Sequence, residues 1–146
     1  MMYLVRVSAV TAVLALSGAA SAHAQAAFDM KGGWSGTGES IVRGSAAHHP
    51  AGDAAKPAGN ARLREVTFTY KIDGQDGGRF WGTVASRYAT ESVIGVIAAD
   101  RKRVYIVTEF GFVDGVITDN DTIDICYREL KPSDAVVACN VIKRTK

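Results

Sequence analysis

The chain has 146 residues, of which 17 are basic and 15 acidic, so its formal net charge is only +2. Nucleic-acid-binding domains typically show a strongly basic balance or a basic stripe, and here basic and acidic residues are intermixed, so we exclude nucleic acid as a partner. A chain of this length forms one domain with a hydrophobic core large enough to be stable.

Residues 1–24 have the features of a secretory signal peptide. Arg6 supplies the positive charge, residues 7–16 form the apolar stretch, and Ala22-His23-Ala24 is a small-x-small cleavage site. The apolar stretch is shorter than the roughly 20 residues of a membrane helix, so an uncleaved anchor is the less favoured alternative. We therefore expect a periplasmic or secreted protein with no membrane span in its mature chain.

The first strand is predicted at residues 32–42, after a short lead-in at 25–31. In the lead-in, the apolar Phe28 and Met30 are expected to plug one end of the fold. Within the strand, alternation places Trp34 on the same face as Gly36, Gly38 and Ser40. Several glycines in one strand indicate a sharp bend or the close approach of another backbone, as at the corner of a barrel.

Residues 44–61 show no period and are predicted to form a long mobile loop. A loop of this length is typically either a functional lid or a disordered insertion. It contains His48 and His49, which could in principle bind a metal. Adjacent residues in an extended segment point apart, however, and a third ligand would have to come from elsewhere. We therefore expect a solvated loop, no metal site and no cofactor.

Seven further segments have the alternation and the flanking turn residues of strands, and no segment shows a sustained helical period. They are residues 63–72, 79–88, 92–98, 103–109, 112–118, 122–130 and 135–144. Together with the first strand they make eight, the number at which an up-and-down antiparallel barrel closes and can still hold one small ligand. The predicted fold is therefore all-β, a single eight-stranded barrel domain spanning residues 32–146.

The two cysteines predict one disulfide across the last hairpin, because an exported chain with two cysteines usually pairs them. If residues 131–134 form a four-residue loop, counting outward places Cys126 opposite Cys139. Facing residues of the non-hydrogen-bonded type lie about 4.5 Å apart at Cα, within reach of a disulfide. The opposite face of this hairpin carries Ile123, Ile125 and Ile142, and is the better candidate for the barrel interior.

The same alternation identifies the side chains that face the lumen. They are Ser40, Val42, Phe68, Tyr70, Phe80, Val84, Tyr127 and Asn140. The register of the hairpin formed by 63–72 and 79–88 stays open, because a slip of one residue exchanges the two faces. With that slip, Trp81 replaces Phe80 inside.

The residues Gly32-Gly33-Trp34 resemble the Gly-x-Trp signature of the calycin superfamily, which includes the lipocalins and the avidins. In lipocalins a basic residue near the end of the last strand packs over this tryptophan, and Arg144 falls at the matching place. The resemblance implies a structural closure in which Arg144 lies over Trp34, a cation–π contact of roughly 0.5–2 kcal/mol. A lipocalin Thr-Asp-Tyr-like motif is missing, so an avidin-like or more distant bacterial barrel is equally compatible.

The resemblance also implies that the protein carries a small, partly apolar ligand in its lumen. The candidate ligand-binding residues are Ser40, Tyr70, Tyr127 and Asn140, because buried polar groups need partners and a ligand can provide them. The alternative is that these groups are satisfied within a filled core, since small barrels are often packed solid.

A second hypothesis is an envelope protein-binding module, such as a protease or lysozyme inhibitor. It would act through its loops or through exposed apolar residues such as Trp81 or Phe112. We expect no enzyme and assign no catalytic residue. The only histidines outside the signal peptide lie in the predicted loop, and no nucleophile sits on a strand-to-helix turn.

Overall fold

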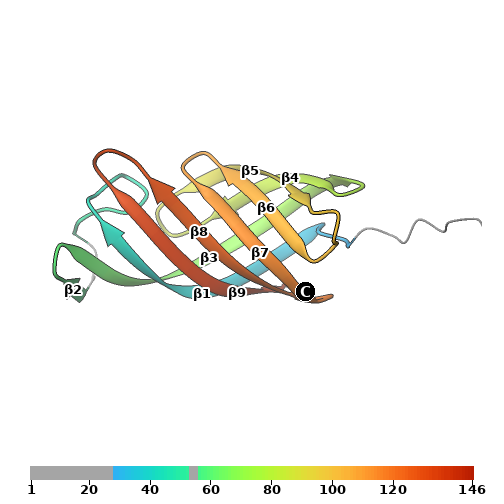
Figure 1. Ribbon diagram of the computed structural model, residues 1–146, viewed down its shortest axis with the longest axis horizontal. Helices are drawn as coiled ribbons and strands as arrows, with labels where there is room; N and C mark the ends of the chain where they lie inside the picture. Colours follow the sequence, from blue (N-terminus) through green and yellow to red (C-terminus); the bar gives the residue numbers. More distant parts are fainter. Residues whose placement is uncertain (1–27, 53–55) are drawn as a thin grey trace, which may run out of the picture.

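The computed structural model describes residues 28–52 and 56–146, so the predicted signal peptide lies outside the described residues. The described chain is all-β and forms one antiparallel sheet (Figure 1). Its strands are β1 (Gly32–Arg43), β2 (Lys56–Ala58), β3 (Ala61–Asp76), β4 (Arg79–Ala85), β5 (Thr90–Ile97), β6 (Arg103–Thr108), β7 (Phe112–Asp119), β8 (Thr122–Leu130) and β9 (Ala135–Arg144). Across this part of the chain, no helix has the length and apolar character needed to cross a membrane.

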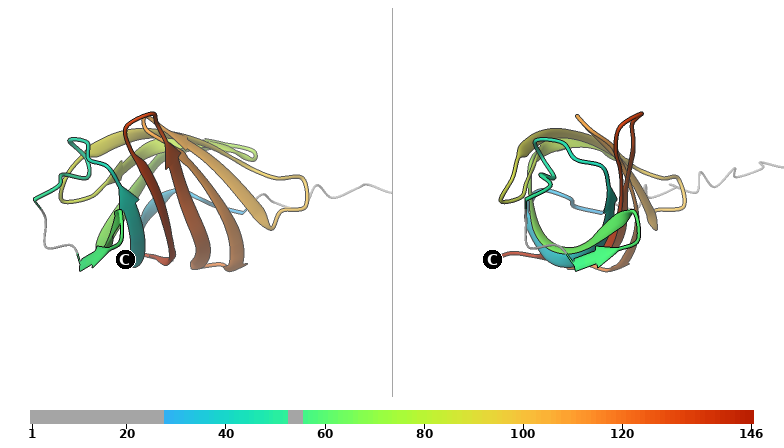
Figure 2. Two further views of the ribbon diagram at one scale, coloured as in Figure 1. Left: turned by 60° about the vertical axis from the view of Figure 1, so that its left-hand side comes forward. Right: turned by 90° about the vertical axis from the view of Figure 1, so that its left-hand side faces the viewer.

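The sheet closes into an eight-stranded barrel, which confirms the predicted fold class. Each strand from β3 to β9 pairs with its neighbour in the sequence, and β1 pairs with both β9 and β3. Seen from one end, these strands form a complete ring (Figure 2, right). The short β2 pairs only with β3 and extends that strand beyond the ring.

One half of the lumen is filled by a hydrophobic core. Trp34 is fully buried there, and its indole N–H donates to the carbonyl oxygen of Met30 at 2.8 Å. Met30 is itself buried, and the ring of Phe28 lies 6.0 Å from the ring of Trp34. The lead-in thus plugs this end of the barrel, as predicted (Figure 2, blue segment).

The structure determines the register that the sequence left open. Phe80 is 2% exposed and Trp81 is 48% exposed, so Phe80 lies inside. β3 extends beyond its predicted end at residue 72, because after a bulge between Ile72 and Gly74 its pairing with β4 continues to Asp76. Gly74 is required at this bulge, since a Cβ there would lie 2.3 Å from the ring of Trp81.

β4 is shorter than predicted and ends at Ala85. The hydroxyl oxygen of Ser86 accepts a hydrogen bond from the backbone N–H of Tyr88 at 3.1 Å, and the N–H of Ser86 donates to the carbonyl oxygen of Ala89 at 2.8 Å. This local turn ends the strand, because a serine side chain competes with the sheet for backbone donors.

The last hairpin has the predicted register, with Cys126 facing Cys139. The two cysteines form a disulfide, and their Cα atoms are 4.1 Å apart. Ile123, Ile125 and Ile142 are all buried on the opposite face, in agreement with the interior face chosen from the sequence.

The segment 44–61 is not one unstructured loop as predicted. Ala46 and His49 form an isolated bridge, in which the N–H of His49 donates to the carbonyl oxygen of Ala46 at 3.0 Å. Further along, β2 and the start of β3 form a short hairpin. The part that follows β1 crosses the end of the barrel opposite to the lead-in (Figure 2, right). Residues 53–55 lie outside the described residues.

Candidate functional site

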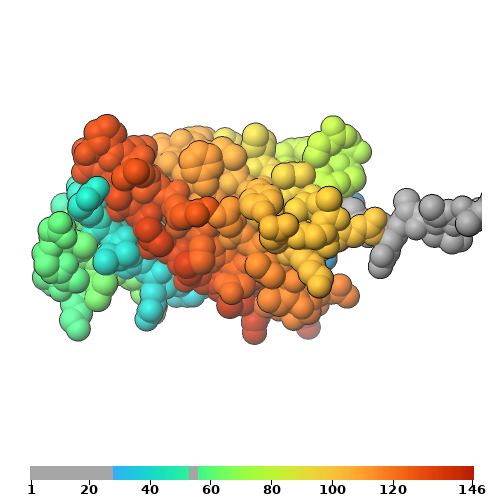
Figure 3. All heavy atoms as spheres, viewed as in Figure 1, coloured from blue at the N-terminus to red at the C-terminus, as the bar shows by residue number. Residues whose placement is uncertain are grey.

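The half of the lumen under the segment 44–52 contains a cavity of about 60 Å³. Roughly 10–15 Å³ of such volume holds one water molecule, and pockets for drug-sized ligands reach about 300–1,000 Å³. The cavity therefore has room for a molecule of a few non-hydrogen atoms. The side chains of β6 to β9 form a continuous surface in the space-filling view (Figure 3), so the cavity does not open through this part of the wall.

All four residues predicted to bind a ligand line this cavity, namely Ser40, Tyr70, Tyr127 and Asn140. Ser40 donates to the backbone carbonyl of Arg64 at 3.4 Å, so its hydroxyl has a partner within the protein. The amide nitrogen of Asn140 is buried and has no hydrogen-bond partner in the described chain. Phe80 also lies inside the barrel as predicted, in the packed half of the lumen rather than at the cavity.

Of the three tyrosines that line the cavity, Tyr70 and Tyr127 are neutral phenols. Burial raises the pKa of Tyr70, and the nearby Glu91 raises it further. Burial also raises the pKa of Tyr127, whose hydroxyl donates to Glu129 Oε2 at 2.7 Å. Neither side chain therefore carries a negative charge, and the single donor of Tyr127 is already used by Glu129.

Three charged residues of the cavity were missed by the sequence analysis: Arg64, Glu91 and Glu129. Alternation could have found them, since Glu129 lies two residues after Tyr127 on the lumen side of β8. Charged side chains are rarely buried without a partner, which is why we did not assign them to an interior. Arg64 lies over the ring of Tyr88 at 4.6 Å, and Glu91 Oε2 is buried with no hydrogen-bond partner among the described residues.

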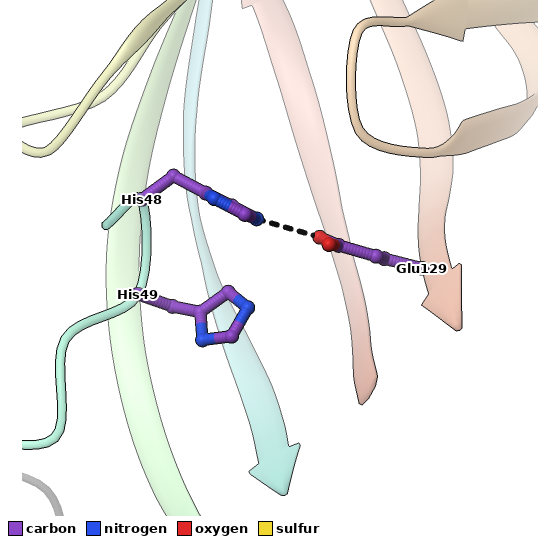
Figure 4. A group of neighbouring side chains, drawn as sticks. All are labelled: His48, His49 and Glu129. Atoms are coloured by element: carbon purple, nitrogen blue, oxygen red, sulfur yellow. Dashed lines mark hydrogen bonds and ion pairs between the residues drawn. The ribbon is translucent and has the colours of Figure 1, made fainter. Parts of the chain in front are cut away.

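His48 and His49 are brought to the mouth of the cavity, next to Glu129 (Figure 4). His48 Nε2 lies 2.8 Å from Glu129 Oε2, and the His48 ring stacks on Phe110 with the ring centroids 4.0 Å apart. His49 is 4% exposed. The expectation of a solvated pair is therefore wrong. It assumed an extended segment, whereas the tight turn closed by Ala46 and His49 directs both rings toward β8.

His49 lacks hydrogen-bond partners at both ring nitrogens within the described residues. Its Nε2 lies 3.3 Å from Asp134 Oδ1, without hydrogen-bond geometry. A neutral imidazole needs one acceptor for its N–H and one donor for its other nitrogen. The Nε2 of this buried ring is thus left with the contact to Asp134, and its Nδ1 has no partner among the described residues.

Glu129 is ionised despite its burial. Desolvation alone would raise the pKa of Glu129, but hydrogen bonds from Lys131, Tyr127 and His48 outweigh it and hold that pKa below its ordinary value. The Lys131 Nζ lies 2.6 Å from Glu129 Oε1. Because an ionised carboxylate only accepts hydrogen bonds, the Nε2 of His48 is the donor in the contact with Oε2.

The predicted structural closure is present at the opposite end of the barrel. The guanidinium carbon of Arg144 lies 4.1 Å from the ring centroid of Trp34. Arg144 also donates to the carbonyl oxygens of Asp29 and Lys31 at 2.7 and 2.8 Å. It therefore joins the end of β9 to the lead-in as well as covering the tryptophan.

The fold and the site define a small closed antiparallel β-barrel, compatible with a calycin-like fold, with a polar-lined cavity at one end. Comparisons with protein-family models, curated proteins and solved structures give no match for this chain. The functional argument therefore depends on the cavity and its side chains.

Proposed function

We propose that the protein is an exported binding protein, rather than an enzyme, that holds a small ligand in the barrel lumen. The observation that carries this proposal is a cavity whose wall includes buried polar atoms without partners, at Glu91 and Asn140. An unsatisfied buried polar group costs roughly 1–3 kcal/mol, so a molecule that pairs with these atoms is favoured by about that amount at each contact.

The size and lining of the cavity restrict the ligand. It must be smaller than the partly apolar ligand expected from the sequence, because about 60 Å³ accommodates only a few non-hydrogen atoms. It must donate a hydrogen bond to Glu91 and accept one from the amide of Asn140. Small amides and small hydroxylated molecules have this chemistry, and Phe68 and Val84 provide apolar contacts for their carbon atoms.

Export is supported by two independent features. The sequence begins with a predicted signal peptide, and the described chain contains a disulfide, which persists mainly in oxidising compartments. We therefore propose a periplasmic or secreted location, which cell fractionation of a tagged full-length chain tests directly. Recovery of the uncleaved chain in the cytoplasm would contradict it.

The ligand proposal is tested with a panel of small amides, alcohols and urea derivatives added to the purified protein. We expect at least one to raise the melting temperature and to shift the NMR signals of lumen residues. Asn140→Leu, which removes the amide at similar volume, should weaken that ligand at least tenfold. Asn120→Leu, in an exposed turn, is the control and should leave the affinity unchanged. The proposal is overturned if no compound of the panel binds, or if Asn140→Leu and Asn120→Leu lose the same affinity for the ligand.

The protein-binding alternative is favoured by a separate observation on the outer face of the barrel. Four exposed apolar residues face one another across β4 to β7, namely Trp81, Ile94, Val107 and Phe112. Contiguous exposed apolar surface of this kind often marks a protein interaction site.

This alternative is tested by placing a photoreactive amino acid at Ile94 in cells, with Lys71 on β3 as an exposed control position. A protein partner bound through this face gives one adduct, identifiable by mass spectrometry, at position 94 and not at 71. If position 94 gives no more adduct than position 71, the alternative fails.

A further inference from the structure

The geometry points to a binding site for one divalent transition-metal ion of the zinc type, with His48, His49 and Glu129 as its ligands. These residues offer two imidazole nitrogens and one carboxylate oxygen, and the three ligand atoms lie within 4.8 Å of one another. Imidazole and carboxylate are standard ligands for zinc. The site goes beyond the proposed function, because a metal held here requires no organic ligand in the lumen.

The third ligand comes from a distant part of the chain. His48 and Glu129 are separated by 81 residues, and the fold of segment 44–52 across the barrel end brings them into contact. In Figure 4 the rings of both histidines and the carboxylate of Glu129 converge on one region. Three ligands supplied by two separate elements form a site that exists only in the folded protein.

The buried imidazole of His49 is the observation that favours a metal over a simple hydrogen-bonded cluster. A hydrogen-bonded cluster would satisfy the ring, whereas Nδ1 of this ring has no hydrogen-bond partner in the described chain and Nε2 has only its contact with Asp134. A metal ion bound at one nitrogen satisfies the ring at that position. The neighbouring carboxylate of Asp134, 3.3 Å from Nε2, adds negative charge beside the ring. Carboxylates next to metal-bound histidines orient the ring and increase its basicity.

The separations of the ligand atoms, all within 4.8 Å of one another, suit a metal once the histidine and carboxylate side chains rearrange, the longest separation shortening by up to about 1.5 Å. Tetrahedral zinc with ligands at about 2.0–2.1 Å holds those ligands about 3.3 Å apart. His48 Nε2 donates to Glu129 Oε2 at 2.8 Å, so metal binding at Nε2 places the proton of the neutral imidazole on Nδ1 and separates the two ligand atoms by about half an ångström. Widening this pair needs only a side-chain adjustment.

Other side chains hold the ligands in place. Phe110 stacks on the His48 ring, and Tyr127 donates to the Oε2 of Glu129. Lys131 binds the other oxygen, Oε1, and so leaves Oε2 on the histidine side. Lys131 also places a positive charge near the ion, which Asp134 offsets on the other side of the cluster. Supporting contacts of this kind typically accompany a metal site.

The three ligands leave a coordination position for an exogenous group. All three residues line the lumen cavity, so this position faces the space where a small molecule enters. Zinc sites with three protein ligands commonly bind water or a further ligand in the fourth position. The metal would thus sit between segment 44–52 and the cavity.

The test is a calorimetric titration of the chelator-treated protein with Zn²⁺ alone. We expect one ion per chain, and a loss of affinity of at least a hundredfold in His49→Gln and in Glu129→Gln. Asp124→Asn, an exposed carboxylate on the same strand as Glu129, should bind Zn²⁺ like the original protein. Glutamine at position 129 still accepts hydrogen bonds, and the melting temperature without metal verifies that each variant is folded.

A spectroscopic measurement identifies the ligands. Bound Cu²⁺ should show nitrogen coupling from two imidazoles in electron paramagnetic resonance, and from one in His49→Gln. Unsaturable binding, or equal affinity in the folded ligand variants, overturns the inference. The Zn²⁺ titration uses no organic ligand, so failure of the organic-ligand panel and failure of the metal site are distinguishable.

Discussion

Trp34 is the residue on which the packed end of the barrel depends. It is fully buried, it donates a hydrogen bond to Met30, and it lies between the ring of Phe28 and the guanidinium of Arg144. These contacts connect the lead-in, the first strand and the last strand. A single side chain thus links the start of the described chain to its end.

Trp34→Ala should lower the free energy of unfolding by roughly 3–5 kcal/mol, because truncating a buried tryptophan leaves a cavity. The control is Trp81→Ala, at the half-exposed tryptophan of β4, which should cost clearly less. Denaturant unfolding followed by circular dichroism measures both. A loss below about 0.5 kcal/mol for Trp34→Ala, typical of a surface position, would contradict the role assigned to this residue.

At the scale of elements, the last hairpin shows how far local pattern determines structure. Counting from the turn gave the Cys126–Cys139 pair and the buried isoleucines, because β8 and β9 are regular strands joined by a short loop. The hairpin of β3 and β4 was less predictable. There a bulge lies between Ile72 and Gly74, and Trp81 packs where a Cβ at position 74 would lie, a contact that sequence alternation does not encode.

The disulfide should stabilise this hairpin by roughly 3 kcal/mol, the value of the chain-entropy model for a closed loop of about 14 residues. Its cysteines are separated by 13 positions and lie on the face opposite the buried isoleucines, so the double variant Cys126→Ser/Cys139→Ser creates no core cavity. We expect a lower melting temperature than that of the original protein. Adding reductant should lower the melting temperature of the original protein toward that of the variant. If the original protein, the reduced protein and the variant all melt at the same temperature, the disulfide does not stabilise the fold.

The segment after β1 is the element that sequence patterns described least well. It has no period, and its structure depends on contacts with distant residues: His48 with Glu129, and the backbone of Gly44 with Arg62 and the β8–β9 turn. Such contacts are determined by the closure of the barrel. The sequence analysis therefore identified two of the three candidate metal ligands, the adjacent histidines, but not the carboxylate of Glu129.

Gly44→Ala should displace this segment. Gly44 has φ +73°, and a Cβ there would lie 2.1 Å from the carbonyl oxygen of Ser133. The control is Gly59→Ala. Gly59 has φ +61° and no atom near the position of a Cβ, so this variant adds only the backbone strain of about 1–2 kcal/mol, without a steric clash. We expect Gly44→Ala to lose more stability than Gly59→Ala, and to lose Zn²⁺ affinity as well. Equal effects of the two variants in unfolding experiments would show that the segment is not anchored at Gly44.

At the scale of the whole molecule, the lumen is divided into a packed half and a half with a cavity. Alternation predicted which side chains point inward, including Ser40, Tyr70, Tyr127 and Asn140. It could not predict how completely they fill the space, since that depends on the diameter of the barrel and on the end segments. A non-strand segment crosses each end of the barrel, and among the described residues of these two segments only Phe28 and Met30 of the lead-in add large apolar side chains to the core.

The division predicts opposite effects of one substitution in the two halves. Val84 and Val104 are both buried in the core, but Val84 also lines the cavity and Val104 does not. Val84→Ile adds a methylene to available space and should stabilise the protein by up to about 0.8 kcal/mol while weakening ligand binding. Val104→Ile adds the same group where the side chain already contacts the Gly115 region closely, and should cost roughly 1–3 kcal/mol. Denaturant unfolding of the two variants compares the halves directly. Equal destabilisation would mean that the lumen is packed throughout, and would remove the basis for ligand binding within it.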